Sequence, residues 1–210
     1  MMKKLILFIA VGLHVVGSAD ASLITYNVGG VITNVDSRIT SVEIGDTWSA
    51  EFSIESTTLD SDMFAFTGLY RNPVGSYSVG GVQFSSSSNF ASATVAVVNT
   101  THDAFAYDLR SDAGSIDSID GYSLRFIRTI LQDTSGTVFE NDFLTNSIGL
   151  NLSNFDSNLF IAQTFDGNNI FTALRGDITS YSATVVPIPA AVWLFGSSVL
   201  GLLMFRRKEC

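Results

Sequence analysis

The sequence predicts an all-β fold, an antiparallel two-sheet sandwich of the jelly-roll kind, for the central part of the chain. Three observations support this prediction. Apolar and polar residues alternate with a period of two in one segment after another, helical periodicity is scarce, and glycine, asparagine, aspartate and proline separate the segments. About nine or ten short strands at this spacing are typical of a sandwich.

The strongest alternation lies at residues 47–55. Trp48, Phe52 and Ile54 project to one face of the expected strand, and Glu51 and Glu55 project to the other. We therefore expect Trp48 to be a core residue rather than a platform for stacking sugars. Similar patterns predict strands over Leu23 to Val31, Met63 to Tyr70, Tyr77 to Phe84, Ala91 to Val98, Ala104 to Arg110, Tyr122 to Leu131, Leu159 to Phe165 and Ile170 to Val185. Turn residues separate them at Gly29-Gly30, Gly45-Asp46, Asn72-Pro73, Gly80-Gly81, Asp120-Gly121, Ser135-Gly136 and Asp166-Gly167-Asn168.

Residues 1–21 are predicted to be a secretory signal peptide. The basic pair Lys3-Lys4 precedes an apolar stretch from Leu5 to Val16, which is too short to span a membrane. Ala19-Asp20-Ala21 fits the small-x-small pattern that signal peptidase reads, so cleavage is expected before Ser22. Export by the Sec route follows, with an uncleaved anchor helix as the alternative.

The predicted domain, residues 22–185, is strongly acidic. It holds 18 acidic residues, six arginines and no lysine, a net charge of −12. This charge argues against binding to nucleic acid or anionic lipid, and suits a solvated extracellular surface or one that holds divalent cations. The only cysteine, Cys210, is the last residue, so the domain has no disulfide and depends on its own core.

Residues 186–210 are predicted to form a sorting tail with one transmembrane helix. The order is Val186-Pro187-Ile188-Pro189-Ala190-Ala191-Val192-Trp193-Leu194-Phe195-Gly196-Ser197, then an apolar run to Phe205, then Arg206-Arg207-Lys208. Proline disfavours helix at the residue before it, so the helix should start at Pro189 or Ala190. About 16 helical residues, or 24 Å, are short for a permanent span. The basic end should stay cytoplasmic, which places the domain outside.

This tail resembles the PEP-CTERM sorting domain of Gram-negative bacteria, in the variant with an aliphatic residue between the prolines. The resemblance covers residues 186–208. Ile188 stands where the name-giving motif has glutamate, and Ser198 stands where glycine is frequent. The resemblance implies processing by exosortase, a membrane cysteine transpeptidase-like enzyme associated with exopolysaccharide production. It implies nothing about the fold of the domain, and an ordinary single-pass anchor is the alternative.

No residue constellation in the domain points to catalysis. His102 is the only histidine after the signal peptide and is expected in a loop before the strand at Ala104. Glu51 and Glu55 share a strand face, as a glycosidase pair could, but they oppose the Trp48 to Ile54 face, so we interpret them as the solvent side of a half-buried strand.

Calcium is the one metal that the residue types could suit, because its ligands are hard oxygens. The weak candidates are Asp112, Asp117 and Asp120, with further clusters of oxygen ligands at Asp60-Ser61-Asp62 and Asp166-Gly167-Asn168-Asn169. None of these segments matches a twelve-residue calcium loop, so solvated turns are the simpler interpretation.

The leading hypothesis is an exported, non-enzymatic β protein. Its tail would hold it in the inner membrane with the domain outside, until processing delivers it to the cell surface or the extracellular matrix. Signal peptidase, exosortase and an exopolysaccharide are the expected partners, and no cofactor is required. The alternatives are a secreted hydrolase acting on polysaccharide and a calcium-dependent glycan-binding module.

Overall fold

The computed structural model describes residues 22–64, 66–85, 92–110, 118–167 and 169–187, which form an antiparallel β domain. Within these residues the chain forms eleven strands and two short 3₁₀ helices. The strands are β1 (Ser22–Val35), β2 (Thr47–Glu55), β3 (Thr67–Arg71), β4 (Val74–Val79), β5 (Val82–Ser85), β6 (Ser92–Asn99), β7 (Asp103–Arg110), β8 (Ser118–Ile119), β9 (Tyr122–Asp133), β10 (Ser157–Asp166) and β11 (Asn169–Pro187), and the helices are η1 (Leu144–Ser147) and η2 (Leu152–Asn154).

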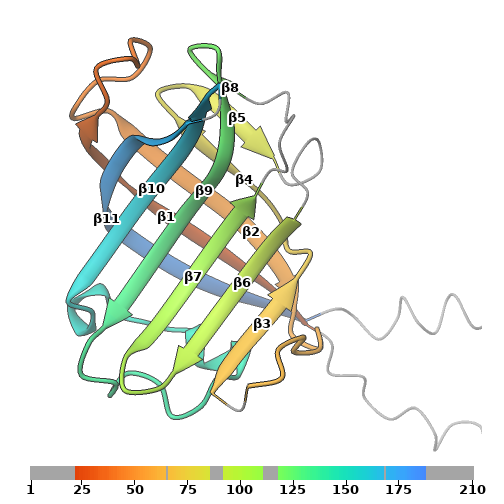
Figure 1. The fold of residues 1–210 in the computed structure, drawn as a ribbon. Helices are drawn as coiled ribbons and strands as arrows, with labels where there is room; N and C mark the ends of the chain where they lie inside the picture. Colours follow the sequence, from red (N-terminus) through yellow and green to blue (C-terminus); the bar gives the residue numbers. More distant parts are fainter. Residues whose placement is uncertain (1–21, 65, 86–91, 111–117, 168, 188–210) are drawn as a thin grey trace, which may run out of the picture. The chain divides into compact units, whose positions relative to one another are not determined.

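The strands belong to one curled sheet. Their order is β3-β6-β7-β9-β10-β11-β1-β2-β4-β5, with β8 paired to β9. The sheet curls so that β3, β6, β7, β9 and β10, the first half-sheet, lie across from β1, β2, β4 and β5, the second half-sheet (Figure 1). The all-β antiparallel prediction is confirmed. The expected pair of separate sheets is replaced by a single sheet, because hydrogen bonding continues through β11 from one half to the other.

Strand β11 connects the two half-sheets. Its first part pairs with β10 from Asn169 to Asp177, with a bulge in the register, and its later part lies against β1. A Cβ atom added to Gly30 of β1 would stand 1.8 Å from the carbonyl oxygen of Asp177, and one added to Gly176 would stand 2.5 Å from that of Val31. Glycine at both positions therefore lets the two strands approach where the sheet bends.

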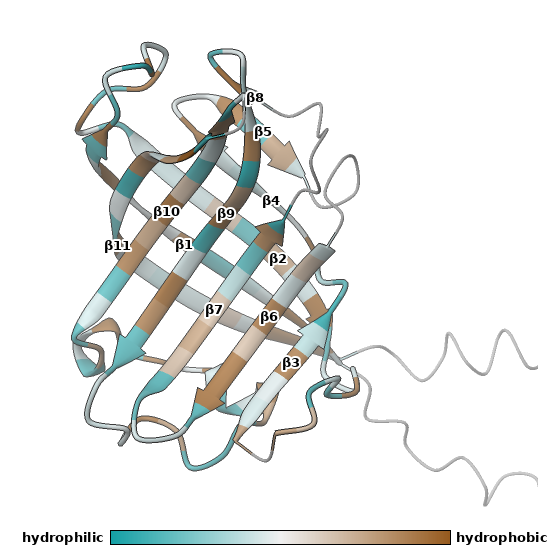
Figure 2. Cartoon of the chain, in the orientation of Figure 1, coloured by the Kyte–Doolittle hydropathy of each residue, from teal (hydrophilic) through white to brown (hydrophobic). Residues whose placement is uncertain are grey.

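Aromatic rings fill the space between the half-sheets. The centroid of the Phe52 ring lies 3.9 Å from that of Tyr107 and 4.8 Å from that of Tyr26. Trp48 stacks on Phe160 at 4.5 Å. All five side chains are buried, so the prediction that Trp48 belongs to the core is confirmed. Figure 2 shows the underlying alternation as bands of contrasting hydropathy along the strands.

Two of the predicted strands differ from the observed elements. The segment predicted from Met63 becomes strand only at Thr67, because the carboxylate of Asp62 accepts hydrogen bonds from the backbone N–H groups of Met63 and Phe64 and holds a turn. The segment from Tyr77 to Phe84 is the hairpin of β4 and β5. Gly80 and Gly81 form its turn with φ of 54° and 85°, which glycine adopts without strain.

The connection between β9 and β10, residues 134–156, closes one end of the interior. Leu144 is buried, and its backbone N–H donates to the Tyr70 hydroxyl over 3.1 Å. The hydroxyl groups of Ser147 and Tyr26 are hydrogen-bonded at 2.6 Å, and both residues are buried. The connection thus supplies apolar cover and a partner for a buried phenol, which the sequence pattern did not indicate.

Candidate functional site

Most of the predicted sorting and cleavage residues lie outside the described residues. Ala19 and Ala21 precede them, and the tail from Ile188 to Cys210, with its expected helix and basic end, follows them. Val186 and Pro187 are the exposed last residues of β11, so the strand extends two residues beyond the predicted end at Val185 and runs directly into the motif. Across the described ranges, no helix has the length and apolar character needed to cross a membrane.

Only one of the three calcium candidates, Asp120, lies in the described part of the chain. Asp112 and Asp117 lie outside the described residues, and Asp120 holds a turn instead. Its carboxylate accepts hydrogen bonds from the backbone N–H groups of Thr40 and Ser41, and these donors lower its pKa. In the part of the chain that the structure describes, no group of three or more metal-ligating side chains occurs. The carboxylates of Asp60 and Asp62 likewise bind backbone N–H groups of their own loop.

His102 lies in an exposed bend directly before β7, as expected. Its Nδ1 atom is 3.0 Å from the hydroxyl oxygen of Thr101. The neighbouring Asp103 is fully buried, and its carboxylate accepts hydrogen bonds of 2.7 Å from the backbone N–H groups of Val138 and Phe139. Asp103 therefore anchors the 134–156 connection and does not orient the imidazole.

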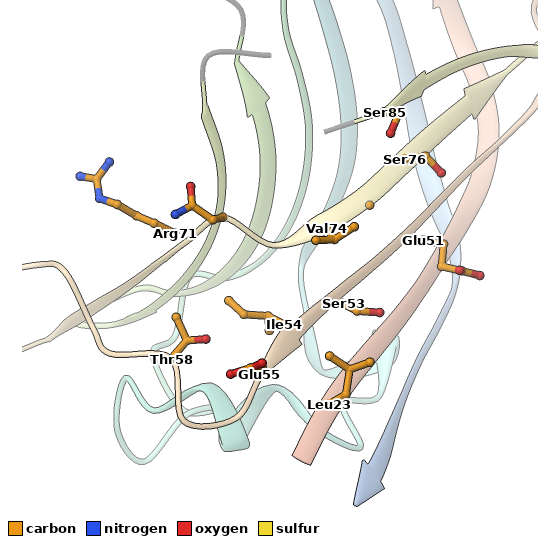
Figure 3. Close-up of a pocket in the computed structure, with 12 residues that line it drawn as sticks. Leu23, Glu51, Ser53, Ile54, Glu55, Thr58, Arg71, Val74, Ser76 and Ser85 are labelled. Atoms are coloured by element: carbon orange, nitrogen blue, oxygen red, sulfur yellow. The ribbon is translucent and has the colours of Figure 1, made fainter. Parts of the chain in front are cut away.

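Glu51 and Glu55 line a shallow hollow on the outer face of the second half-sheet. The hollow has a volume of about 730 Å³. Figure 3 shows the two glutamates at separate places along β2, with Ser53 between them. Four residues of strand separate their Cα atoms by about 13 Å. Both glutamates are on the exposed face of β2, where a half-buried strand places its polar residues.

A second hollow, on the outer face of the first half-sheet, gathers half of the domain's arginines. We call it the arginine groove. Its volume is about 400 Å³. It is lined by Leu69, Arg71, Ser92, Thr94, Ala96, Val98, Ala104, Ala106, Asp108, Arg110, Arg128 and Ile130.

Strand register creates the charged row of the groove. Arg71 of β3 pairs with Thr94 of β6, Thr94 pairs with Asp108 of β7, and Asp108 pairs with Arg128 of β9. Since neighbouring strands are about 4.8 Å apart, the Cα atoms of Arg71 and Arg128 are separated by about 14 Å. Arg110 lies two residues beyond Asp108 on the same strand and the same face.

Asp108 holds two of the three guanidinium groups. Arg128 donates to both carboxylate oxygens, with 2.7 Å from its Nη2 to Oδ2, and Arg110 donates through Nη2 over 3.2 Å. The hydrogen bond to Asp108 raises the pKa of Arg128. The side chain of Asp108 is 9% exposed, whereas that of Arg110 is 57% exposed. Arg110 thus keeps most of its donors available to a ligand.

Arg71 is the third arginine that lines the groove. Its Nε donates to the Ser61 hydroxyl over 3.0 Å, which orients the guanidinium. Three arginines and one aspartate leave the groove at +2 inside a domain of −12. Guanidinium groups bind carboxylates, sulfates and phosphates with paired, charge-assisted hydrogen bonds. The small side chains of Thr94, Ala96 and Ala106 line the groove between the arginines, so a flat ligand can approach the sheet there.

The groove was not predicted from the sequence. Period-two alternation places Asp108 and Arg110 together on one strand face, and that was the only available signal. Joining them to Arg71 and Arg128 requires the cross-strand register. Comparison with protein-family profiles, with curated proteins and with solved structures found no match to this chain.

Proposed function

We propose that this chain is an exported, non-enzymatic surface or matrix protein that binds an acidic polysaccharide in the arginine groove. Its C-terminal tail would hold it in the inner membrane until exosortase processes it. The binding part of the proposal is carried by the row Arg71, Thr94, Asp108 and Arg128, because cross-strand pairing gathers positive charge in an otherwise acidic domain.

The shape and chemistry of the groove favour a polymer of carboxylate-bearing sugars. A hollow of about 400 Å³ suits a short stretch of chain. The exposed guanidinium of Arg110 and that of Arg71 can each grip a carboxylate, while the Ala96 and Ala106 methyl groups can contact the apolar faces of sugar rings. The negative charge of the surrounding domain would limit such binding to the groove.

The delivery part of the proposal rests on the tail motif and on where the folded domain ends. Strand β11 continues to Pro187, and the Pro187-Ile188-Pro189 motif begins there without an intervening linker. Removal of the tail after this strand would release a domain that keeps its whole sheet.

Intact mass spectrometry of the protein recovered from membranes and from the growth medium tests delivery. We expect chains in the medium that begin at Ser22 and end between Val186 and Pro189, and longer chains in the membrane fraction. A strain that lacks the processing enzyme should retain the full tail. Full-length tails in every fraction of the parent strain would contradict sorting and leave a plain anchor.

Binding to alginate oligosaccharides tests the groove. The double variant Arg71→Gln with Arg110→Gln should weaken binding at least about a hundredfold at low salt, because each of the two lost charge-assisted contacts contributes about 1.5 kcal/mol or more. Arg128 is left intact because it neutralises the buried Asp108. Isothermal titration calorimetry gives the dissociation constants, with neutral dextran as the comparison ligand.

Arg125→Gln is the matched control for this experiment. Arg125 is an exposed arginine of β9 that does not line the groove, and replacing it removes one positive charge from the same half-sheet. It should change alginate affinity by less than about twofold. Equal losses in the control and the double variant would indicate diffuse attraction, and equal binding of dextran would exclude recognition of the carboxylates.

A further inference from the structure

Five large apolar side chains stand exposed beside the edge of β3. Leu59, Met63, Phe64 and Phe66 belong to the loop between β2 and β3, and Phe143 belongs to the 134–156 connection. Their exposed fractions run from 62% for Phe66 and Phe143 to 95% for Met63. We call these five residues the apolar rim. Exposed apolar side chains gathered in this way mark a surface that contacts a partner or a membrane.

The loop is built to hold these side chains outward. The Asp60 carboxylate accepts hydrogen bonds of 2.8 Å from the backbone N–H groups of Asp62 and Leu69, and the Ser61 N–H donates to the Leu69 carbonyl over 2.9 Å. Asp62 accepts from the N–H of Met63 over 2.7 Å. The polar groups of the loop therefore face β3, and its apolar side chains are left to the solvent.

Phe143 is held against the same edge. The carbonyl oxygen of Asp142 accepts a hydrogen bond of 3.0 Å from the Tyr70 hydroxyl, and it would stand 2.3 Å from a Cβ atom on Gly68. Gly68 and Tyr70 are residues of β3, directly after the loop. Two segments distant in the sequence thus contribute to one rim.

The rim lies near the point where the chain leaves the sheet. Glu55, the last residue of β2, pairs with Leu23 at the start of β1. On the other side of β1, the neighbouring strand in the sheet is β11. Its end lies beside the start of β1, since the Thr184 hydroxyl donates to the Thr25 carbonyl oxygen over 3.5 Å. The loop that carries the rim therefore begins about 10 Å, two strand spacings, from the end of β11.

The short segment between the end of β11 and the predicted tail helix limits how far the bilayer can lie from the rim. If the tail helix starts at Pro189 or Ala190, at most two residues separate its start from Pro187, so the Cα atoms of Pro187 and of the first helical residue lie within about 11 Å of each other. A bilayer that holds the tail must then lie close to this end of the sheet. Val185 and Val186, 43% and 54% exposed, add apolar surface along the same exit.

We infer that the apolar rim inserts into the outer surface of the zwitterionic phospholipid bilayer that holds the tail. This contact rests on the proposed function, because it requires the tail to be in the membrane. It would fix the tilt of the domain and present the Pro187-Ile188-Pro189 segment at the lipid surface, where the processing enzyme acts. Asp60, Asp62 and the net charge of −12 disfavour anionic lipid.

A fluorescent depth measurement on the full chain tests this contact. In a Cys210→Ser background, Met63→Cys supplies the only thiol for a nitrobenzoxadiazole label, and the protein is reconstituted into phosphatidylcholine vesicles. We expect a blue-shifted emission that spin-labelled lipids quench at least about fivefold more than at a control position. Adding Phe64→Ser and Phe66→Ser should lower that quenching by about half or more while vesicle flotation is retained.

Ile44→Cys provides the control position. Ile44 is 69% exposed but lies in the loop at the opposite end of β1 and β2, about 26 Å of strand away. Its label should stay in water and escape quenching by lipid. The same labelled chains are also reconstituted with anionic phosphatidylglycerol, where quenching at position 63 should decrease.

The outcomes separate the contact from the proposed function. Failure of the chain to float with vesicles overturns the membrane tail and the contact together. Flotation with an unquenched label at position 63 overturns the contact alone. A blue shift that grows with protein concentration and is insensitive to lipid quenchers overturns it in favour of pairing between two copies of the chain.

Discussion

Replacing Phe52 with alanine should lower the free energy of unfolding by about 3 to 5 kcal/mol. The ring is fully buried and stacks on Tyr26 of β1 at 4.8 Å and on Tyr107 of β7 at 3.9 Å, so it contacts both half-sheets. Removing it leaves a cavity between strands that are fixed by hydrogen bonds on either side. The half-sheets therefore cannot close the gap freely. Denaturant titration followed by tryptophan fluorescence measures the loss, because Trp48 lies in the same core.

Phe143→Ala is the control for this variant. It deletes the same ring from a side chain that is 62% exposed, and it should change stability by less than about 0.5 kcal/mol. A loss below about 1 kcal/mol for Phe52→Ala would mean that this ring does not hold the half-sheets together.

Replacing Gly30 with alanine should destabilise the domain by about 3 kcal/mol or more. The added Cβ would stand 1.8 Å from the backbone carbonyl oxygen of Asp177 and 2.8 Å from Nε1 of Trp48. Neither atom is the end of a flexible side chain, so β1 must move away from β11 where the sheet bends. Thermal unfolding measures the stability. Relative to the parent protein, hydrogen exchange in the variant should increase more along β11 than along β6.

Gly29→Ala is the matched control, one residue away on the same strand. Its added Cβ would meet the Ser180 hydroxyl at 2.9 Å, and that side chain can rotate away. The expected loss is about 1 kcal/mol or less. Similar losses for both variants would contradict a specific close approach of β1 and β11 at Gly30.

The sequence predicted the strand content well because alternation is a local property. Trp48, Phe52 and Ile54 are buried on one face of β2, while Glu51 and Glu55 are exposed on the other, as expected. The prediction failed where side chains bind the backbone locally. Asp62 turns the chain at Met63, where alternation alone predicted strand.

The candidate site was much less predictable. The sequence pointed to acidic turn residues as possible calcium ligands, yet the Asp120 carboxylate accepts a hydrogen bond from the backbone of the 36–46 loop. The sequence pattern did not predict a site at the arginines of the groove. Arg71 and Arg128 are far apart in the chain, and they line one hollow only because β6 and β7 pair between their strands. Register between distant strands depends on the packing of the whole interior, which a local pattern does not contain.

By itself, the sequence determined which face of each strand is apolar and how acidic the domain is, and it predicts a signal peptide before the domain and a sorting tail after it. These follow from side-chain period, charge count and hydropathy, which are properties of neighbouring residues. Only the tertiary structure decided that the sheet is single and curled, that Arg71, Arg110 and Arg128 share one groove, and that the apolar rim lies near the end of β11. Each of these depends on which distant strands pair, and that is set by burying Phe52 and its aromatic neighbours between the two half-sheets.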